Sequence, residues 1–152
     1  VQRMLDRGTT VNEVEEYVRA VSARGGIVFS ADTLEYLQRN GRIGRGRALI
    51  GGILRVRPIL ELVNGEVDAV RRVRGRRAVI PALLDVMLRR SAGFPQIDVV
   101  VLHAAWPTEA ARLEQAVVTS RPGIVSVRTA EIGAVIGAHV GPGALGICFL
   151  AR

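Results

Sequence analysis

The chain has 152 residues, of which 49% are hydrophobic and 23% charged, and its formal net charge is +7. This composition is typical of a globular protein rather than a disordered one, and the length suits a single domain with a buried core. The single cysteine, Cys148, excludes a disulfide within the chain. It lies in an apolar stretch, where we expect a buried, reduced thiol.

Periodicity and turn residues predict helices alternating with strands. The expected helices are 9–24, 32–42, 46–54, 75–90 and 107–120, and the expected strands are 26–31, 56–63, 66–74, 97–106, 123–130 and 144–151. We therefore expect an α/β (α+β) fold, a two-layer sandwich in which helices cover a mixed six-stranded sheet. Neither a repeat nor a Pro/Gly/Ser-rich linker divides the chain, so residues 1–152 are expected to form one domain.

Local signals support several of these elements. Thr10 and Glu13 have the spacing of a capping box, which predicts the start of the first helix. Asp32 is expected at the N-cap of the second helix, and Gly41 just past its end. Asn64–Gly65 suits the type I′ turn of a β-hairpin, so the two strands around it are expected to pair in antiparallel.

One histidine lies in a glycine-rich stretch, IGAHVGPGALG, at residues 136–146. The glycines offer His139 no side chain to hydrogen-bond, so two interpretations remain open. Either the stretch is a structural turn that His139 caps, or it brings an imidazole and backbone N–H groups up to a ligand. The other histidine, His103, is expected to be a core residue at a strand end. The two histidines match no metal-ligand spacing.

The stretch from Ile132 to Ala151 resembles a membrane span in length, because its twenty residues contain no Asp, Glu, Lys or Arg. However, it contains five glycines and Pro142. Each glycine disfavours a helix interior by about 1 kcal/mol and a proline by about 3 kcal/mol. We therefore expect no membrane span here, but a glycine-rich turn followed by a buried strand.

The positive charge is concentrated in one segment. All 21 basic residues are arginine, and eleven of them lie between Arg39 and Arg77, where the acids are Glu61, Glu66 and Asp68. This segment therefore carries +8 and the rest of the chain −1. Such a patch attracts polyanions, so a module that binds nucleic acid or an acidic protein partner is the alternative function. Nucleic acid is the less favoured partner, because aromatics are scarce and no DNA- or RNA-binding signature is present.

Two parts of the chain carry a family resemblance. They are DTLEYLQRNGRIGRGRALIGGILRVRPILELVNGEVDAVRRVRGRRAVIPALLD (residues 32–85) and EIGAVIGAHVGPGALGICF (residues 131–149). In this order, they resemble the C-terminal domain of the DegV family of bacterial fatty-acid-binding proteins. The resemblance extends over residues 11–150, nearly the whole chain. It implies a fragment that lacks the N-terminal DegV domain.

The resemblance implies a carrier rather than an enzyme. In this family a long-chain fatty acid lies in an apolar tunnel between two domains. Its carboxylate is held mainly by Thr and Ser side chains of the N-terminal domain. The carrier presents the carboxylate to a fatty acid kinase, which forms acyl phosphate for phospholipid synthesis. The sequence itself displays no nucleophile–base pair, carboxylate dyad or metal-ligand set, so we expect no catalytic residue, metal or cofactor. Because the sequence shows no signal-peptide pattern, we expect the protein to be located in the cytoplasm.

The resemblance also implies site residues. The candidates are His139 near the carboxylate, Gly141 and Gly143 with accessible backbone N–H groups, Arg74 and Arg42 as anion contacts, and Leu49, Ile50 and Leu54 as tunnel walls. Alternatives remain for several of them. Arg74 is followed by Gly75 rather than the usual Thr and could be a solvated strand residue, and Arg42 is more readily explained by bonds to carbonyls at a helix end. The three apolar residues could equally be core. An exposed apolar strip is expected where the absent domain docks, and it could also pair two copies.

Overall fold

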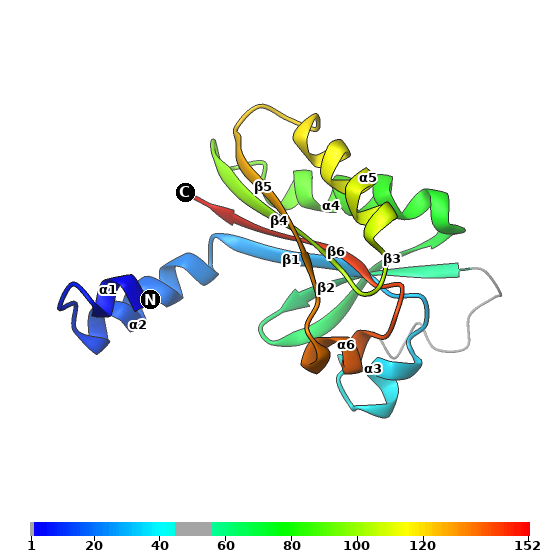
Figure 1. The fold of residues 1–152 in the computed structure, drawn as a ribbon, viewed down its shortest axis with the longest axis horizontal. Coiled ribbons are helices and arrows are strands. Elements are labelled where there is room, and N and C mark those ends of the chain that lie inside the picture. Colours follow the sequence, from blue (N-terminus) through cyan, green and yellow to red (C-terminus); the bar gives the residue numbers. More distant parts are fainter. Residues whose placement is uncertain (1, 45–55) are drawn as a thin grey trace.

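The computed structural model describes residues 2–44 and 56–152. The helices are α1 (Gln2–Leu5), α2 (Val11–Ser22), α3 (Glu35–Arg39), α4 (Val79–Arg90), α5 (Pro107–Val118) and α6 (Ala134–Val140), and a 3-10 turn (Arg76–Ala78) precedes α4. The strands are β1 (Gly25–Ser30), β2 (Val56–Val63), β3 (Glu66–Arg74), β4 (Ile97–His103), β5 (Ile124–Glu131) and β6 (Leu145–Ala151) (Figure 1). The expected helix at 46–54 lies outside the described residues.

The six strands form one mixed sheet in the order β3-β2-β1-β6-β4-β5, which confirms the predicted fold class. β4 and β5 are parallel and are joined through α5, as in a βαβ unit, whereas the other neighbouring strands are antiparallel. The β2–β3 hairpin turns at Asn64 and Gly65, whose φ angles of 51° and 82° suit a type I′ turn, as predicted.

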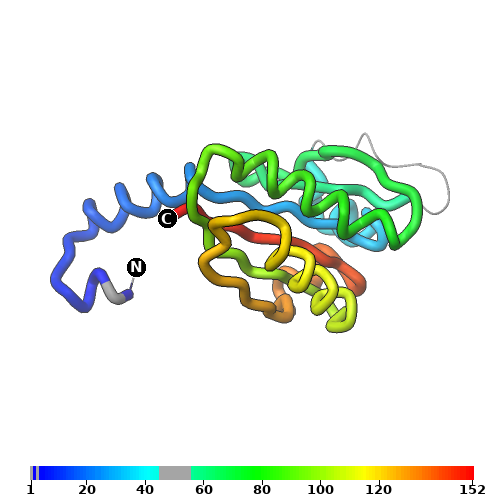
Figure 2. Tube along the Cα trace, turned by 90° about the horizontal axis from the view of Figure 1, so that it is seen from above, coloured from blue at the N-terminus to red at the C-terminus, as the bar shows by residue number. Residues whose placement is uncertain are grey.

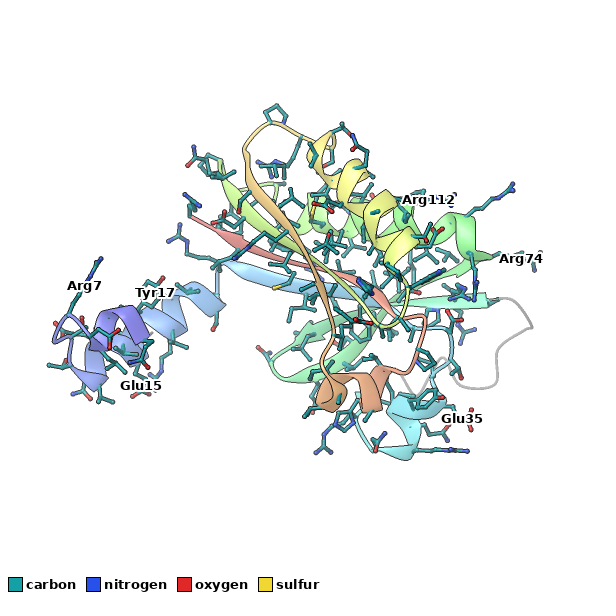
Figure 3. All side chains as sticks on the ribbon, in the orientation of Figure 1. Arg7, Glu15, Tyr17, Glu35, Arg74 and Arg112 are labelled. Carbon is teal, nitrogen blue, oxygen red and sulfur yellow. The ribbon has the colours of Figure 1, made fainter. Side chains whose placement is uncertain are left out.

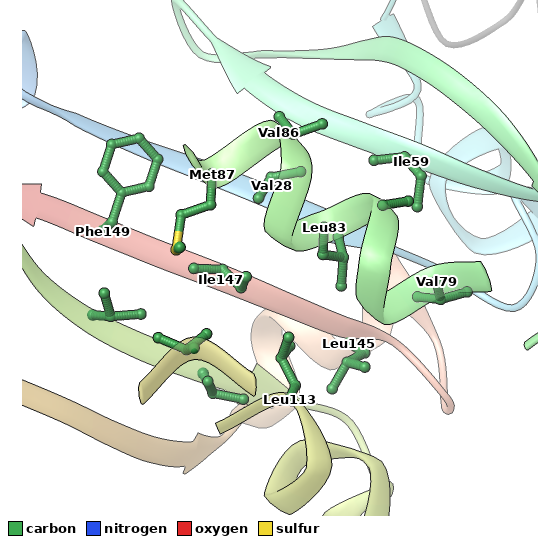
Figure 4. Close-up of a cluster of buried hydrophobic side chains, with 14 of the residues drawn as sticks. Val28, Ile59, Val79, Leu83, Val86, Met87, Leu113, Leu145, Ile147 and Phe149 are labelled. Carbon is green, nitrogen blue, oxygen red and sulfur yellow. The ribbon is translucent and has the colours of Figure 1, made fainter. Parts of the chain in front are cut away.

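One face of the sheet packs on α4 and α5 and forms the main core. Alternate strand residues such as Val28, Val101 and Ile147 point to this face, where they meet Leu83 and Met87 of α4 (Figure 4). All five are at most 2% exposed. Figure 2 shows α4 and α5 running together over this side of the sheet. The domain is therefore a two-layer sandwich on this side.

The opposite face of the sheet, which we call the open face, is covered differently. The register places Val100, Cys148 and Ile27 in one row across three strands, and Leu102, Gly146 and Phe29 in the next. Except for the buried Gly146, these residues are half-buried. Among the described helices, α3 and α6 lie side by side at one end of this face (Figure 1). Burial raises the pKa of the Cys148 thiol, so the thiol stays protonated at neutral pH.

Helices α1 and α2 extend from the sheet as an arm (Figures 1 and 2). The predicted capping box is confirmed, because the Thr10 and Glu13 side chains each bond the other residue's backbone N–H. On the arm, Val14 is buried, whereas Tyr17 and Val18 are 48% and 41% exposed. Tyr17 is labelled in Figure 3. The arm thus carries exposed apolar surface beyond the edge of the sheet.

Three predictions about local structure were wrong. Asp32 does not cap α3, whose N-cap is Leu34, because its carboxylate is used by two arginines instead. The helix expected to start at Gly75 begins as a 3-10 turn and becomes α-helical at Val79. The region expected to be a glycine-rich turn contains helix α6, which was not predicted. In the described part of the chain, every helix is too short or too polar to cross a bilayer.

Candidate functional site

An apolar pocket of about 430 Å³ lies on the open face, between the sheet and helix α6. Phe29 and Leu102 line it from the sheet, and Gly146 lies opposite both of them on the strand between. A Cβ on Gly146 would lie 2.8 Å from the Cβ of Phe29, so a larger residue would crowd the pocket floor. We call this cavity the α6 pocket.

The wall of the α6 pocket opposite the sheet comes from α6. Val135 and Ile136 of this helix line the pocket and are 76% and 55% exposed. Leu62, on β2, lines the pocket as well and is 42% exposed. Three large apolar side chains therefore remain in contact with water around one cavity. This is the surface expected of a site that another apolar group covers.

His139 brings a polar group into this apolar wall. His139 lines the α6 pocket, and the Nδ1 atom of its imidazole is buried without a hydrogen-bond partner among the described residues. A buried polar nitrogen without a partner costs free energy that a ligand's polar atom would recover. Arg42 lines the same pocket. A cavity with apolar walls and two nitrogen-bearing side chains suits a molecule that has an apolar chain and an acidic head group.

The predicted site residues separate into three groups. His139 and Arg42 meet at the α6 pocket. Arg42 also donates from Nη1 to the carbonyl of Asn40 at 3.4 Å, which agrees with its expected role at a helix end. Arg74 lies at the end of β3, is exposed, and does not line this pocket (Figure 3). The proposed tunnel residues Leu49, Ile50 and Leu54 lie outside the described residues.

The backbone N–H groups of Gly141 and Gly143 are bonded within the fold. The N–H of Gly141 donates to the carbonyl of Gly137 at 2.8 Å, and the N–H of Gly143 donates to the carbonyl of Ala104 at 2.8 Å. Both N–H groups are therefore already bonded within the fold, and contact of Gly141 and Gly143 with a ligand stays a prediction. Their φ angles of 75° and 76° require glycine, and both lie against side chains of the segment that contains α3.

Sequence reasoning missed most of the pocket. Phe29 and Leu102 lie in strands that were predicted, but the face of the sheet that each would occupy was not. Successive residues of a strand point to opposite faces of the sheet, and this alternation was the signal that could have assigned Phe29 and Leu102 to the open face. Val135 and Ile136 were missed because α6 itself was not predicted: the helix is only seven residues long and contains Gly137.

Two further residues, at the end of β4 and just after it, have structural roles. His103 is 7% exposed at the end of β4, and its Nδ1 accepts a hydrogen bond from the N–H of Trp106 at 3.3 Å. This confirms the predicted core position. Trp106 packs against the main core, and the guanidinium groups of Arg57 and Arg76 lie 5.7 and 4.9 Å from its ring centroid.

Part of the charge of the basic segment 39–77 is neutralised within the fold. Its ion pairs include Arg39–Glu35 (2.7 Å), Arg57–Asp32, Arg76–Asp32 (3.0 Å) and Arg71–Asp85 (3.0 Å). An arginine that already has a carboxylate partner contributes less to counterion release from nucleic acid. This weakens the alternative of a basic patch that binds polyanions.

Asp32 binds two of these arginines. Its oxygens accept hydrogen bonds from Arg57, which is 12% exposed, and from Arg76. Burial is the largest single influence and would raise the pKa of Asp32. The hydrogen bonds and charges of Arg57 and Arg76 together outweigh it and lower this pKa below the ordinary 3.8. The charged form of Asp32 therefore stabilises the folded state.

We expect Asp32→Asn to reduce the free energy of unfolding at pH 7 by about 1–3 kcal/mol, the usual contribution of hydrogen bonds to a charged group. Because the folded pKa of Asp32 is lowered, its contribution is complete above the unfolded pKa and is lost as pH falls through the folded value. The unaltered chain and the variant should therefore converge in acid. Urea unfolding followed by circular dichroism from pH 7 downward tests this, and a difference that does not change with pH would contradict it.

Comparison with known proteins identifies the family. The model of a family described as "Uncharacterised protein, DegV family" matches residues 1–152. The chain belongs to the DegV family. A DegV domain-containing protein of Streptomyces coelicolor is 37% identical over 147 residues, covering 97% of this chain and 52% of that protein. Protein DegV of Bacillus subtilis is 35% identical over 140 residues, covering 91% of this chain and 48% of that protein.

A solved DegV structure has the same fold. A DegV family protein from Thermus thermophilus, described by its fatty acid binding, superposes with a TM-score of 0.90 at 30% identity. The match covers 99% of this chain and 54% of that chain. This chain therefore spans about half the length of the DegV proteins to which it is similar.

Proposed function

We propose that this chain is the part of a fatty-acid carrier that forms one wall of the acyl-chain site. The observation that carries the proposal is the apolar α6 pocket, which is lined by His139, a residue whose buried Nδ1 has no partner among the described residues. The acyl chain would lie against Phe29, Leu102 and Ile136, and the carboxylate would lie at His139. The fatty acid binding of the Thermus thermophilus relative supports the same ligand class.

The energetics favour a long chain and a second wall. Each methylene transferred from water contributes about 0.8 kcal/mol, so a chain of about ten or more carbons gains enough to overcome the cost of association. The exposure of Val135, Ile136 and Leu62 means that one side of a bound chain would still contact water. We propose that a second domain, which the twofold greater length of the relatives would accommodate, closes the site over the α6 pocket.

The carrier role extends this proposal to a partner enzyme. In the cytoplasm, a fatty acid kinase would convert the presented carboxylate to acyl phosphate for phospholipid synthesis. Arg74 is exposed at the end of β3, away from the α6 pocket, and it therefore suits contact with such a kinase rather than with the fatty acid. In this scheme the chain binds and presents its ligand, and the kinase makes and breaks the bonds.

Native mass spectrometry of the chain purified from bacterial cells tests the division of the site. With one wall only, we expect the chain to retain less than one fatty acid per molecule, although added fatty acid still binds weakly. In concentrated solution the open face is also expected to pair with a second copy. Stoichiometric retention of a fatty acid by this chain as a monomer would contradict the need for a second wall.

A further inference from the structure

The segment from Asp32 to Asn40, which contains α3, contacts the segment that carries His139 at three points. The Asn40 side-chain amide donates to the carbonyl of Ala138 at 3.0 Å. The ring of Tyr36 lies against Gly141, where an added Cβ would come within 2.4 Å of the ring carbon Cδ2. The carboxylate of Asp32 lies against Gly143, where an added Cβ would come within 2.7 Å of its Cγ.

These three contacts come from successive parts of the α3 segment. Asp32 precedes α3, Tyr36 lies in the helix and Asn40 is its C-cap residue. The contacts fall just before His139 at Ala138 and after it at Gly141 and Gly143. Figure 1 shows α3 and α6 adjacent to one another at the end of the open face. The α3 segment therefore holds the backbone on both sides of the histidine.

The imidazole itself gains little from hydrogen bonding within the protein. Its Nδ1 has no partner among the described residues, so no bond from them at this nitrogen fixes the orientation of the ring. The backbone around it is instead anchored to the rest of the fold through Asp32, which Arg57 of β2 and Arg76 after β3 bind. The position of the imidazole at the α6 pocket thus depends on the α3 segment.

We propose that Asp32, Tyr36 and Asn40 are positioning residues for His139. They hold α6 and the glycine turn after it, so that the His139 side chain stays at the α6 pocket and can meet a carboxylate without first being ordered. This requirement for close contact also explains the two glycines: Gly141 leaves room for the Tyr36 ring and Gly143 for the Asp32 carboxylate. The role in ligand binding rests on the proposed function, whereas the positioning does not.

Nuclear magnetic resonance of the histidine side chains tests the proposal in the ligand-free chain. The chain has two histidines, so the Cε1–Hε1 signal of His139 can be compared with that of His103, which is buried at the end of β4. Tyr36→Ala should broaden or split the His139 signal and leave the His103 signal unchanged. Tyr36→Phe keeps the ring against Gly141 and should restore one sharp signal. Asn40→Ala removes the hydrogen bond to the carbonyl of Ala138 and should broaden the His139 signal as well.

Titration with sodium decanoate below its micelle concentration then links position to binding. In Tyr36→Ala the affinity should fall about fivefold to tenfold, the contribution of one well-placed hydrogen bond, and Tyr36→Phe should restore it. A His139 signal as sharp in Tyr36→Ala and Asn40→Ala as in the unaltered chain would overturn the positioning role. If decanoate perturbs no residue of the α6 pocket in the unaltered chain, the proposed function fails, while the line shapes still decide the positioning.

Discussion

Replacing Ile136 by aspartate is expected to abolish most acyl-chain binding without disturbing the fold. Ile136 lines the α6 pocket and is 55% exposed, so a polar side chain can replace it without being buried in the core. A bound acyl chain would cover this carboxylate, and the ligand's own carboxylate would meet a like charge in the same cavity. We expect the affinity for decanoate to fall at least about tenfold, a loss near ~1.4 kcal/mol.

Val118→Asp provides the matched control for this change. Val118 is 52% exposed, and it lies at the end of α5, a helix that packs on the opposite face of the sheet. The same charge is introduced at nearly the same exposure, but away from the α6 pocket. Both variants are titrated with decanoate and followed through backbone amide signals. Equal affinity in Ile136→Asp and Val118→Asp would show that the ligand does not use the α6 pocket.

The second large effect is expected in the main core. Leu83 of α4 has no exposed surface and lies among Val28, Ile147 and Met87 (Figure 4). Leu83→Ala removes buried methyl and methylene groups and leaves a cavity, which costs about 2–5 kcal/mol in comparable cores. Because folded domains are stable by only about 5–15 kcal/mol, the variant should unfold at much lower urea concentration.

Val125→Ala on β5 serves as the comparison, since Val125 is 42% exposed and its truncation should change the free energy of unfolding by no more than about 0.5 kcal/mol. Urea unfolding monitored by circular dichroism measures both variants. A loss below about 1 kcal/mol for Leu83→Ala would mean that the core collapses around the missing atoms. So small a loss of unfolding free energy would contradict the tight packing of α4 on the sheet.

The order of secondary-structure elements could be predicted where local signals are strong. The capping box at Thr10, the Asn64–Gly65 turn and the apolar runs of β4 and β6 each depend on nearby residues, and all were found where expected. Asp32 shows the limit of such reasoning. An aspartate before a helix favours an N-cap, but here Arg57 and Arg76, distant in the sequence, bind its carboxylate.

The site could be predicted only in part, for a related reason. His139 and Arg42 were singled out through the family resemblance, because they lie in motifs that can be read from the sequence, and both line the α6 pocket. The sheet wall of this pocket is formed by residues that meet only when the strands are in register, as Phe29 and Leu102 do on either side of Gly146. Helix α6 contains a glycine and is stabilised by contacts with α3, and such tertiary contacts override weak local propensity.

Isotope-edited nuclear Overhauser measurements on the chain with 13C-labelled decanoate test the central claim most directly. They report which protein protons lie next to each carbon of the bound ligand. If the α6 pocket is the acyl site, the methylene groups will show contacts to Phe29, Leu102 and Ile136, and the carbon next to the carboxylate will show contacts to His139. Contacts confined to other surfaces of the chain, with none to the α6 pocket, would contradict the account.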